Sequence, residues 1–402
     1  MRRRRVKITG IGPVTPAGIG REAFWNGILE PISRVRPYRK LNAEYGPLVA
    51  GYIDKLDIRD FIDPSLVPKG AARQTVFAIA ATILALRDAR ISNAEVGASG
   101  CAIVIGSSVM DFGGVINSLD SVAKHGARGA KPRSIYTFHA AGVPGSVGEA
   151  LGVTARTMTM QSSCCAGMDA IGYGADLVAN GESDLVICGG TEAPLYQFPI
   201  LELRAAGLTP STHEMPSRLV CPFDLWRTTG VVSEGACMLI LEPESSPRPG
   251  YSYVSGYGFA NDEADVLCSG LAAAGKLALA TAKIRPHQIE AVMAWGPGHS
   301  EINVAEVRSL TSVFGASLAD IPVASTKGSI GLPLGAAPAI DVAAAALGQR
   351  LGMMPPTVNW RNPDPECALN LSNKSRVVSH GLTLINAHGL GGINSSMILE
   401  RC

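Results

Sequence analysis

No stretch of this sequence reaches the roughly 18 uninterrupted apolar residues that a membrane-spanning helix requires. The segment after the N-terminal arginines, V-K-I-T-G-I-G-P-V-T-P, carries a lysine, prolines and glycines where a signal peptide needs a continuous apolar core. These absences argue against a membrane span and a secretion signal. We therefore expect a cytoplasmic protein.

Charge is also scarce. Only 17% of the 402 residues are charged, and the formal net charge is +1. A chain so close to neutrality offers no general surface for nucleic acids or membranes. Its one basic cluster, residues 2–5, is interpreted as a solvated N-terminal tail, with contact to lipid or nucleic acid as the alternative.

The nine cysteines show neither C-x-x-C spacing nor a pairing with histidine at metal-ligand spacing. Cys101, Cys188 and Cys237 lie within apolar, strand-like runs, where cysteine behaves as a small buried hydrophobe. This pattern is typical of a reducing compartment. We expect no metal site and no bound cofactor.

Apolar residues and glycine are abundant instead. The chain is 47% hydrophobic and contains 45 glycines, a composition that suits a large α/β core with tight turns. Short apolar runs alternate with longer helical patterns, which indicates βαβ units with parallel strands. The expected strands are residues 6–11, 101–105, 157–160 and 184–188, and the clearest helix is residues 73–91.

The same order of elements returns in the second part of the chain. Four further strand-like runs repeat the first four in order: 251–256, 291–294, 322–325 and 383–387. A proline- and serine-rich connector, E-P-E-S-S-P-R-P-G, separates the two sets. We therefore predict a duplicated α/β protein with halves 1–245 and 246–402, packed against each other through their apolar faces.

Residues 109–150 interrupt this pattern. They contain D-F-G-G, G-A-R-G-A-K-P-R and A-A-G-V-P-G, and this density of glycine and proline predicts a loop-and-helix insertion over one end of the sheet. Such excursions often cover an active site or form an interface.

The segment T-M-T-M-Q-S-S-C-C-A-G-M-D-A-I-G reads as a strand, a turn of small residues and the start of a helix. Cys164 falls at the turn, where unpaired backbone amides and the positive end of the helix favour a thiolate. From these residues alone, a reactive Cys164 and a buried structural pair of Cys164 with Cys165 remain open alternatives.

The segment Q-S-S-C-C-A-G-M-D-A-I-G resembles the nucleophile segment of the β-ketoacyl-acyl-carrier-protein synthases, with Cys164 at the nucleophile position. V-K-I-T-G-I-G-P-V-T-P-A-G, C-P-F-D with S-E-G-A-C-M-L-I-L-E, P-P-T-V-N-W-R-N-P-D-P-E-C and N-A-H-G-L-G-G-I-N resemble further motifs of that family, in the same order. The resemblance covers nearly the whole chain. It implies the thiolase-type fold of five α-β-α-β-α layers and, usually, a dimer.

Two histidines of that family are replaced here. They donate hydrogen bonds to the malonyl thioester during decarboxylation, and the matching positions hold Trp295 and Leu332. Two threonines that hold the pantetheine arm are replaced by Pro297 and His299. Removing one donor to a developing oxyanion typically costs about 10²–10³ in rate, so the loss of both argues against ordinary chain elongation.

At other positions of the family motifs, two residues are retained and one aromatic residue is replaced by histidine. Lys327 and Glu306 hold the places of a lysine and a glutamate, and we expect them to form a charge pair at the floor of the site, with a purely structural role as the alternative. His388 is assigned to the place of an aromatic gate, so that the amides of Cys164 and His388 would form the oxyanion hole. An imidazole near a thiol also suits a cysteine–histidine dyad, whereas the alternative is a histidine that only fills the gate's volume.

The resemblance and its departures together favour an acyltransferase of fatty-acid or polyketide-type metabolism. Cys164 would take an acyl group from a thioester on an acyl carrier protein or coenzyme A and pass it to water, an amine, an alcohol or a thiol, without decarboxylative elongation. One alternative is a non-catalytic subunit, similar to a chain-length factor, in a heterodimer with a ketosynthase. The other is a β-ketoacyl synthase with a rearranged site that uses Trp295, His299 or His388 as donors.

Overall fold

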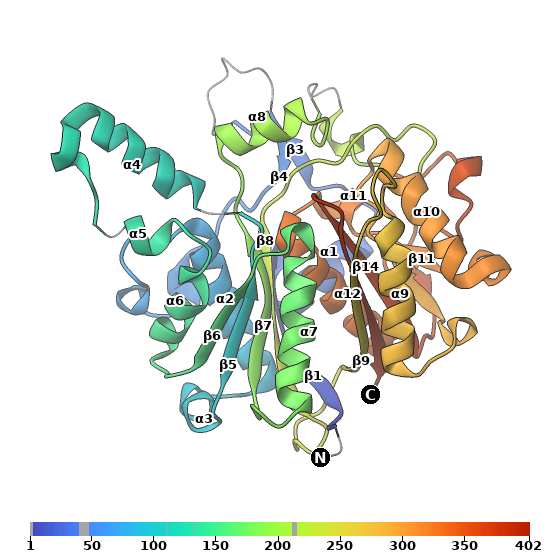
Figure 1. The fold of residues 1–402 in the computed structure, drawn as a ribbon, viewed down its shortest axis with the longest axis horizontal. Coiled ribbons are helices and arrows are strands. Elements are labelled where there is room, and N and C mark those ends of the chain that lie inside the picture. Colours follow the sequence, from blue (N-terminus) through green and yellow to red (C-terminus); the bar gives the residue numbers. More distant parts are fainter. Residues whose placement is uncertain (1–2, 40–47, 110, 133, 211–214) are drawn as a thin grey trace.

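The computed structural model describes residues 3–39, 48–109, 111–132, 134–210 and 215–402 (Figure 1). Arg2, which belongs to the basic cluster named above, lies outside this part. Within it, no helix combines the length and the apolar character needed to cross a membrane. The same residues contain no group of three or more histidine, cysteine or acidic side chains able to hold a metal ion.

One large mixed sheet carries the fold, with the strand order β11-β10-β14-β15-β9-β1-β8-β7-β5-β6 and β2 beside β1. Two short hairpins, β3 with β4 and β12 with β13, lie outside it. The strand bounds are β1 Val6–Thr15, β2 Gly18–Ile19, β3 Val35–Pro37, β4 Val49–Gly51, β5 Ala102–Gly106, β6 Arg156–Met160, β7 Val186–Glu192, β8 Gly235–Pro243, β9 Ser252–Asn261, β10 Ala291–Met293, β11 Val323–Ala324, β12 Met353–Met354, β13 Arg376–Val377, β14 Leu382–Gly389 and β15 Ile393–Arg401.

The sheet confirms the predicted duplication. The first half runs β1-β8-β7-β5-β6 and the second runs β9-β15-β14-β10-β11, so each strand has a counterpart at the same place in the other half. The two halves meet where β1 pairs with β9 through Lys7 and Tyr253. The expectation of parallel strands holds for β5, β6 and β7 and for β10, β11 and β14. It is wrong for the expected strands β1 and β9, which pair antiparallel with β8 and β15 and with each other; β8 and β15 also pair antiparallel with β7 and β14.

Helices form three layers around and between the two halves of the sheet (Figure 1). Helices α7 and α12 lie in the middle, α2 and α6 cover the first half, and α9 and α10 cover the second. This is the expected five-layer, thiolase-like arrangement. The helix bounds are α1 Arg21–Leu29, α2 Arg73–Ala89, α3 Asn93–Ala98, α4 Phe112–His125, α5 Ser134–Thr137, α6 Gly142–Leu151, α7 Ala166–Ala179, α8 Gln197–Ala205, α9 Ser269–Ala282, α10 Ser300–Phe314, α11 Lys327–Ile330 and α12 Ala337–Leu351.

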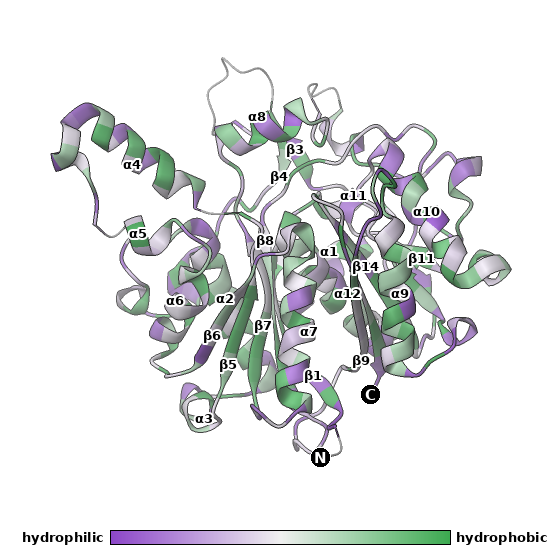
Figure 2. Ribbon diagram, viewed as in Figure 1, coloured by the Kyte–Doolittle hydropathy of each residue, from purple (hydrophilic) through white to green (hydrophobic). Residues whose placement is uncertain are grey.

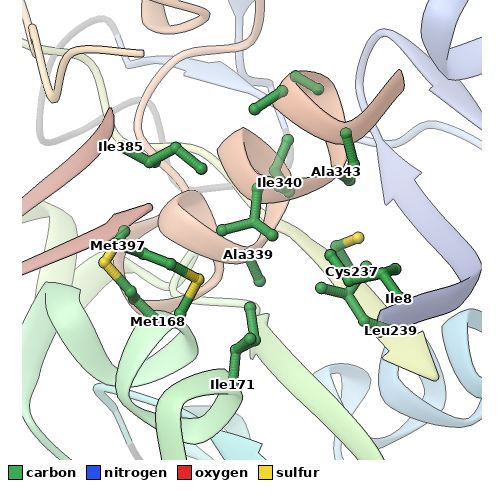
Figure 3. Close-up of a cluster of buried hydrophobic side chains, with 14 of the residues drawn as sticks. Ile8, Met168, Ile171, Cys237, Leu239, Ala339, Ile340, Ala343, Ile385 and Met397 are labelled. Atoms are coloured by element: carbon green, nitrogen blue, oxygen red, sulfur yellow. The ribbon is translucent and has the colours of Figure 1, made fainter. Parts of the chain in front are cut away.

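The apolar faces of the two halves are buried against each other through α7 and α12. Figure 3 shows side chains from both halves converging there, with Met168 and Ile171 of α7 and Ala339 and Ile340 of α12 at the centre. Such burial contributes about 25 cal/mol per Å² of apolar surface removed from water, so this core dominates the stability of the fold. Figure 2 shows that strands β5 and β7 of the sheet are also apolar along their length.

The insertion at 109–150 is more helical than expected. It consists of α4, α5 and α6 with a 3₁₀ turn between α4 and α5, and α4 extends away from the body of the molecule (Figure 1). Helix α6 packs on α2 and on the strands β5 and β6. Two of the insertion's residues, 110 and 133, lie outside the described part of the chain.

Candidate active site

Cys164 lies in a single 3₁₀ turn, Ser163–Cys165, between strand β6 and helix α7. Ser163 has a φ of +52°, in the left-handed region that costs an L residue roughly 1–2 kcal/mol. The turn is tight because α7 begins directly on the sheet: a Cβ on Gly106 of β5 would lie 2.2 Å from the carbonyl oxygen of Ala166. Gly167, at the start of α7, is likewise required by packing, since a Cβ on it would lie 2.6 Å from the carbonyl oxygen of Gly335.

A pocket opens at this turn and gathers most of the residues singled out in the sequence. Cys164 and His388 line it. So do Trp295, Leu332, Pro297 and His299. Its volume is about 50 Å³, which is room for a few water molecules. The remaining wall is mostly apolar, and the complete lining is Cys164, Leu203, Leu208, Gly230, Val232, Trp295, Pro297, His299, Ile302, Leu332, Leu334, His388 and Leu390. No residue of the 109–150 insertion belongs to this lining.

The thiol of Cys164 is protonated at neutral pH. Burial raises its pKa to about 12, and the charge of Glu192 acts in the same direction. This direction opposes the thiolate that the position before the helix favours, because desolvation acts more strongly. Hydrogen bonds to the sulfur from the Ser163 side chain and from the amides of Leu390 and Cys164 lower the pKa, but to a smaller extent.

The expected oxyanion hole, formed by the amides of Cys164 and His388, stays a prediction. Besides the amide of Cys164 itself, the amide of Leu390, two residues after His388, acts to lower the pKa of the thiol. Gly389, between them, packs against the turn, since a Cβ there would lie 3.0 Å from the backbone nitrogen of Cys164. The place of the gate at His388 likewise stays a prediction.

His388 nevertheless lines the pocket, and its tautomer can be assigned. Its Nδ1 lies 2.8 Å from Oδ1 of Asn394, the residue opposite it in the β14–β15 ladder. The Nδ2 group of Asn394 donates to Asp262, Gly392 and Ala260, so its oxygen is the atom that faces the imidazole. His388 therefore carries its proton on Nδ1, and Nε2 is left able to accept one.

The two side chains of the expected dyad are not joined directly. Among the described residues, no hydrogen bond connects Cys164 with His388. The alternative, a histidine that only fills the gate's volume, also stays open; the hydrogen-bond partner of the ring is the side chain of Asn394. The dyad thus remains a proposal that rests on the shared pocket and on the tautomer.

His299 has the opposite tautomer. Its Nδ1 accepts from the amides of Glu301 and Ile302, at 3.3 and 3.5 Å, and thereby caps helix α10. The proton of the neutral ring is then on Nε2. Desolvation lowers the pKa of His299, which keeps it neutral. It is half-buried at the pocket wall.

Lys327 and Glu306 do not form the expected ion pair. Lys327 pairs instead with Asp341 of α12, and both side chains are completely buried. Its ammonium also lies 4.8 Å from the ring centroid of Trp295, a cation–π contact. Glu306 accepts from the amides of Trp295 and Gly296, each at 2.8 Å. The two residues thus stabilise the floor of the pocket separately.

Glu192, at the end of β7, is a second buried carboxyl group near the thiol. It accepts from Ser107 Oγ at 2.6 Å, from the amides of Ser108 and Val109, and from Gly335 N at 3.5 Å. Burial raises its pKa to about 7. It therefore joins the loop after β5 to the loop that borders the pocket at Leu334.

The sequence analysis missed several residues that hold this site. Three of them, Asp169, Glu192 and Asp341, are acids within apolar segments, and a lone charge in an apolar helix or strand needs a partner. That signal was available in A-P-A-I-D-V-A-A-A-A and in V-I-C-G-G-T-E. The amide of Leu390 carried no signal, because a backbone group is not visible in the side-chain pattern.

Comparison with known proteins places the chain in a family. Residues 3–246 match the model of the β-ketoacyl synthase N-terminal domain, and residues 251–361 match that of the C-terminal domain. The chain is 29% identical to the tetracenomycin polyketide synthase ketoacyl synthase alpha subunit of Streptomyces glaucescens, over 99% of this chain and 97% of that protein. It is 28% identical to the 3-oxoacyl-(acyl-carrier-protein) synthase 2 of Coxiella burnetii, over 100% and 99% of the two chains.

Solved structures agree over the full length of the chain. The ishigamide ketosynthase/chain length factor superposes with a TM-score of 0.92 at 26% identity, covering 100% of both chains. A type II polyketide ketosynthase, solved in complex with its acyl-carrier protein, superposes with a TM-score of 0.90 at 26% identity and the same coverage. Sequence, fold and the position of Cys164 lead to one conclusion: this chain belongs to the β-ketoacyl synthase family.

Proposed function

We propose that this protein is an acyltransferase that loads an acyl group from a thioester onto Cys164 and passes it to an acceptor without decarboxylative elongation. The observation that carries the proposal is that one pocket holds the thiol of Cys164, with backbone amides that act on its sulfur, and a histidine that can accept a proton, His388. Trp295 and Leu332 line the same pocket, at the positions that the resemblance assigns to the two hydrogen-bond-donating histidines.

Acylation requires a base because the thiol is protonated. As Cys164 Sγ attacks the thioester carbonyl, its proton passes to Nε2 of His388, and the backbone amides of Cys164 and His388 stabilise the oxyanion. When the carbonyl re-forms, the carrier thiolate leaves and takes the proton from His388. The product is an S-acyl group on Cys164.

Transfer reverses these steps with a different partner. The acceptor's hydroxyl, amine, thiol or water attacks the acyl carbonyl and gives its proton to His388, and the sulfur of Cys164 departs and is reprotonated. His299, protonated on Nε2, supplies a donor at the pocket wall that can orient the acceptor or the carrier arm. Condensation is disfavoured because leucine cannot donate a hydrogen bond and the indole donates in only one fixed direction.

A second candidate function has one observation in its favour. The pocket at Cys164 has a volume of only about 50 Å³ and is walled by Trp295, Leu332 and Leu334. So little space suits a non-catalytic subunit that shapes the acyl tunnel of a partner ketosynthase, and one structural relative is described as a ketosynthase/chain length factor. Copurification as a heterodimer with a ketosynthase would favour this function.

The partners follow from the proposal. We propose that the acyl donor is an acyl carrier protein or coenzyme A thioester and that the protein is a homodimer. Strand β6 is the last strand on its side of the sheet, and Arg156, Thr157 and Met158 on it are exposed. The exposed apolar side chains of Leu119 and Tyr136 lie on the neighbouring insertion. An open edge beside apolar surface suits strand pairing with a second chain.

The test is intact-protein mass spectrometry after incubation with acetyl, malonyl and longer acyl thioesters, each on carrier protein and on coenzyme A. An acyl adduct that peptide mapping places on Cys164, with no carbon dioxide released from the malonyl thioester, supports the acyltransferase. The absence of an adduct from every donor would overturn it in favour of the non-catalytic subunit.

A further inference from the structure

One carboxylate in the first turn of helix α7 links the Cys164 turn to the second half of the chain. Asp169 accepts three hydroxyl hydrogen bonds: from Ser162 through Oδ2, and through Oδ1 from Tyr257 at 2.8 Å and Ser395 at 2.5 Å. Ser162 directly precedes the strained Ser163, whereas Tyr257 and Ser395 lie on β9 and β15.

The hydroxyl of Ser395 ties this network to the residues that face the thiol. Ser395 is paired with Ala387 in the β14–β15 ladder, and Ala387 immediately precedes His388. A second contact runs in parallel, since Cys165 Sγ donates to the carbonyl of Ile393 on the same strand at 3.4 Å. The Cys164 turn comes from the first half of the chain and the hairpin from the second, so their relative position depends on such contacts.

Burial raises the pKa of Asp169, and the three hydroxyl hydrogen bonds that converge on this partly buried carboxyl group act in the opposite direction, toward the ionised form. Hydrogen bonds to an ionised carboxylate are stronger than those between neutral groups. A neutral replacement at this position keeps the shape of the side chain but weakens all three. The network therefore has the strength and the location to determine where the sulfur lies relative to the hairpin.

We propose that Asp169 is a positioning residue that holds the Cys164 turn in register with the β14–β15 hairpin, which carries the base and the second oxyanion amide. This inference rests on the proposed function of Cys164 as the nucleophile. Asp169 itself touches neither the substrate pocket nor the sulfur, so it acts through Ser162 and Ser395.

The experiment compares Asp169→Asn with a matched control, Asp176→Asn. Asp176 lies two turns further along the same helix and forms a surface ion pair with Arg3. Each variant is assayed for thioester KM and kcat, for the rate of alkylation of Cys164 by iodoacetamide as a function of pH, and for thermal unfolding. Peptide-level mass spectrometry assigns the alkylated cysteine.

In Asp169→Asn we expect acylation to fall about 10²-fold at unchanged KM, because a displacement of the order of 1 Å at the reacting atoms has that effect. Asp176→Asn is expected to keep the wild-type rate. Ser162→Ala and Ser395→Ala each lose one hydrogen bond to a charged group and are expected to fall about tenfold. Their double variant should be no slower than Asp169→Asn, because both act through the same carboxylate.

Equal acylation and alkylation rates in wild type and Asp169→Asn would overturn the inference, and so would an equal loss in Asp176→Asn. If Asp169→Asn does not fold, Ser162→Ala and Ser395→Ala test the positioning role instead. Wild-type acylation rates in both serine variants would then overturn the inference. If wild-type Cys164 accepts no acyl group, the proposed function fails, and the alkylation rates alone still judge the role of Asp169.

Discussion

The imidazole of His388 donates from Nδ1 to the side-chain oxygen of Asn394, 2.8 Å away across the β14–β15 ladder. This bond decides the chemistry available at the pocket, because it leaves Nε2 as a proton acceptor next to a thiol that does not ionise at neutral pH. Asn394 is completely buried and its own amide nitrogen is fully occupied, so the bond has no simple substitute.

Asn394→Ala is therefore expected to slow both acylation of Cys164 and transfer from it, because the same base serves both steps. We expect losses of about 10²-fold or more, in the range typical of general base catalysis. Stopped-flow assays with a thioester that releases a chromophoric thiol measure the two rates separately. Asn394→Asp is not used as the control, because its carboxylate would face that of Asp262, to which the Asn394 amide now donates.

His388→Phe should show the same kinetic loss without unfolding the protein, because phenylalanine fills a similar volume at a buried position. Unchanged transfer kinetics in this variant, together with a wild-type melting temperature, would reduce His388 to a side chain that only fills the pocket wall.

The two adjacent cysteines should behave differently. Cys164→Ala is expected to abolish the covalent acyl adduct, because its sulfur lines the pocket and receives the two amides. Cys165→Ala should retain the adduct, since that thiol is completely buried and donates to the carbonyl of Ile393. Intact-mass measurement after one thioester addition checks both. Equal loss in the two variants would show that the register of the nucleophile segment is wrong.

Much of the fold was predictable because apolar periodicity reports burial, and burial defines the layers. The runs at 6–11, 101–105 and 383–387 became β1, β5 and β14, and their repeated order predicted the duplication. Strand direction was less accessible. Whether β8 and β15 run antiparallel to their neighbours depends on the path of the segments that connect the strands. The pattern of residues within a strand does not indicate that path.

The site was predictable to the level of residue type but not of geometry. Sequence register brought Cys164, His388, Trp295 and Leu332 to one pocket, and the structure confirms that gathering. It could not assign the partner of Lys327, because two buried acids compete for it and only packing selects Asp341. Desolvation of the thiol also depends on the completed fold.

Glu192 should make stability depend on pH in a defined window. Its pKa is raised from 4.5 to about 7 by burial, so between those values the folded state holds a proton that the unfolded state has lost. The stabilisation is complete below the lower value and is lost as pH rises through about 7. The difference corresponds to about 3 kcal/mol. Urea unfolding of wild type and Glu192→Gln across this range measures it.

In Glu192→Gln the free energy of unfolding should fall less steeply between pH 5 and pH 7 than in wild type, because the titrating group is gone. Parallel curves for the two proteins would show that Glu192 is ionised throughout the range and that its hydrogen bonds from the Ser107–Val109 loop outweigh burial.

Asp341→Asn is expected to destabilise the protein strongly. It leaves the ammonium of Lys327 buried without its counter-charge, which typically lowers the free energy of unfolding by about 3–5 kcal/mol. Glu182→Gln serves as the control, because its ion pair with Arg156 is exposed to solvent and should contribute little to stability. Urea unfolding measures the free energy of unfolding of both variants. A similar decrease in the two would show that burial does not make the Lys327–Asp341 pair more important for stability than an exposed ion pair.

Restoring the two family histidines should restore decarboxylation. Trp295 and Leu332 both line the pocket with Cys164, so Trp295→His and Leu332→His would place two donors at the wall where the malonyl carbonyl lies in a condensing enzyme. Because each donor is worth about 10²–10³ in rate, the double variant should release carbon dioxide from a malonyl thioester about 10⁴-fold faster than wild type, and each single variant far less. The measurement is release of labelled carbon dioxide, with melting temperatures to show that the cavity left by the indole has not unfolded the protein. Adding Cys164→Ala to the double variant should abolish condensation with an acyl primer. A wild-type protein that releases carbon dioxide as fast as the double variant, in a Cys164-dependent way, would instead show that His299 or His388 already supplies the missing donors.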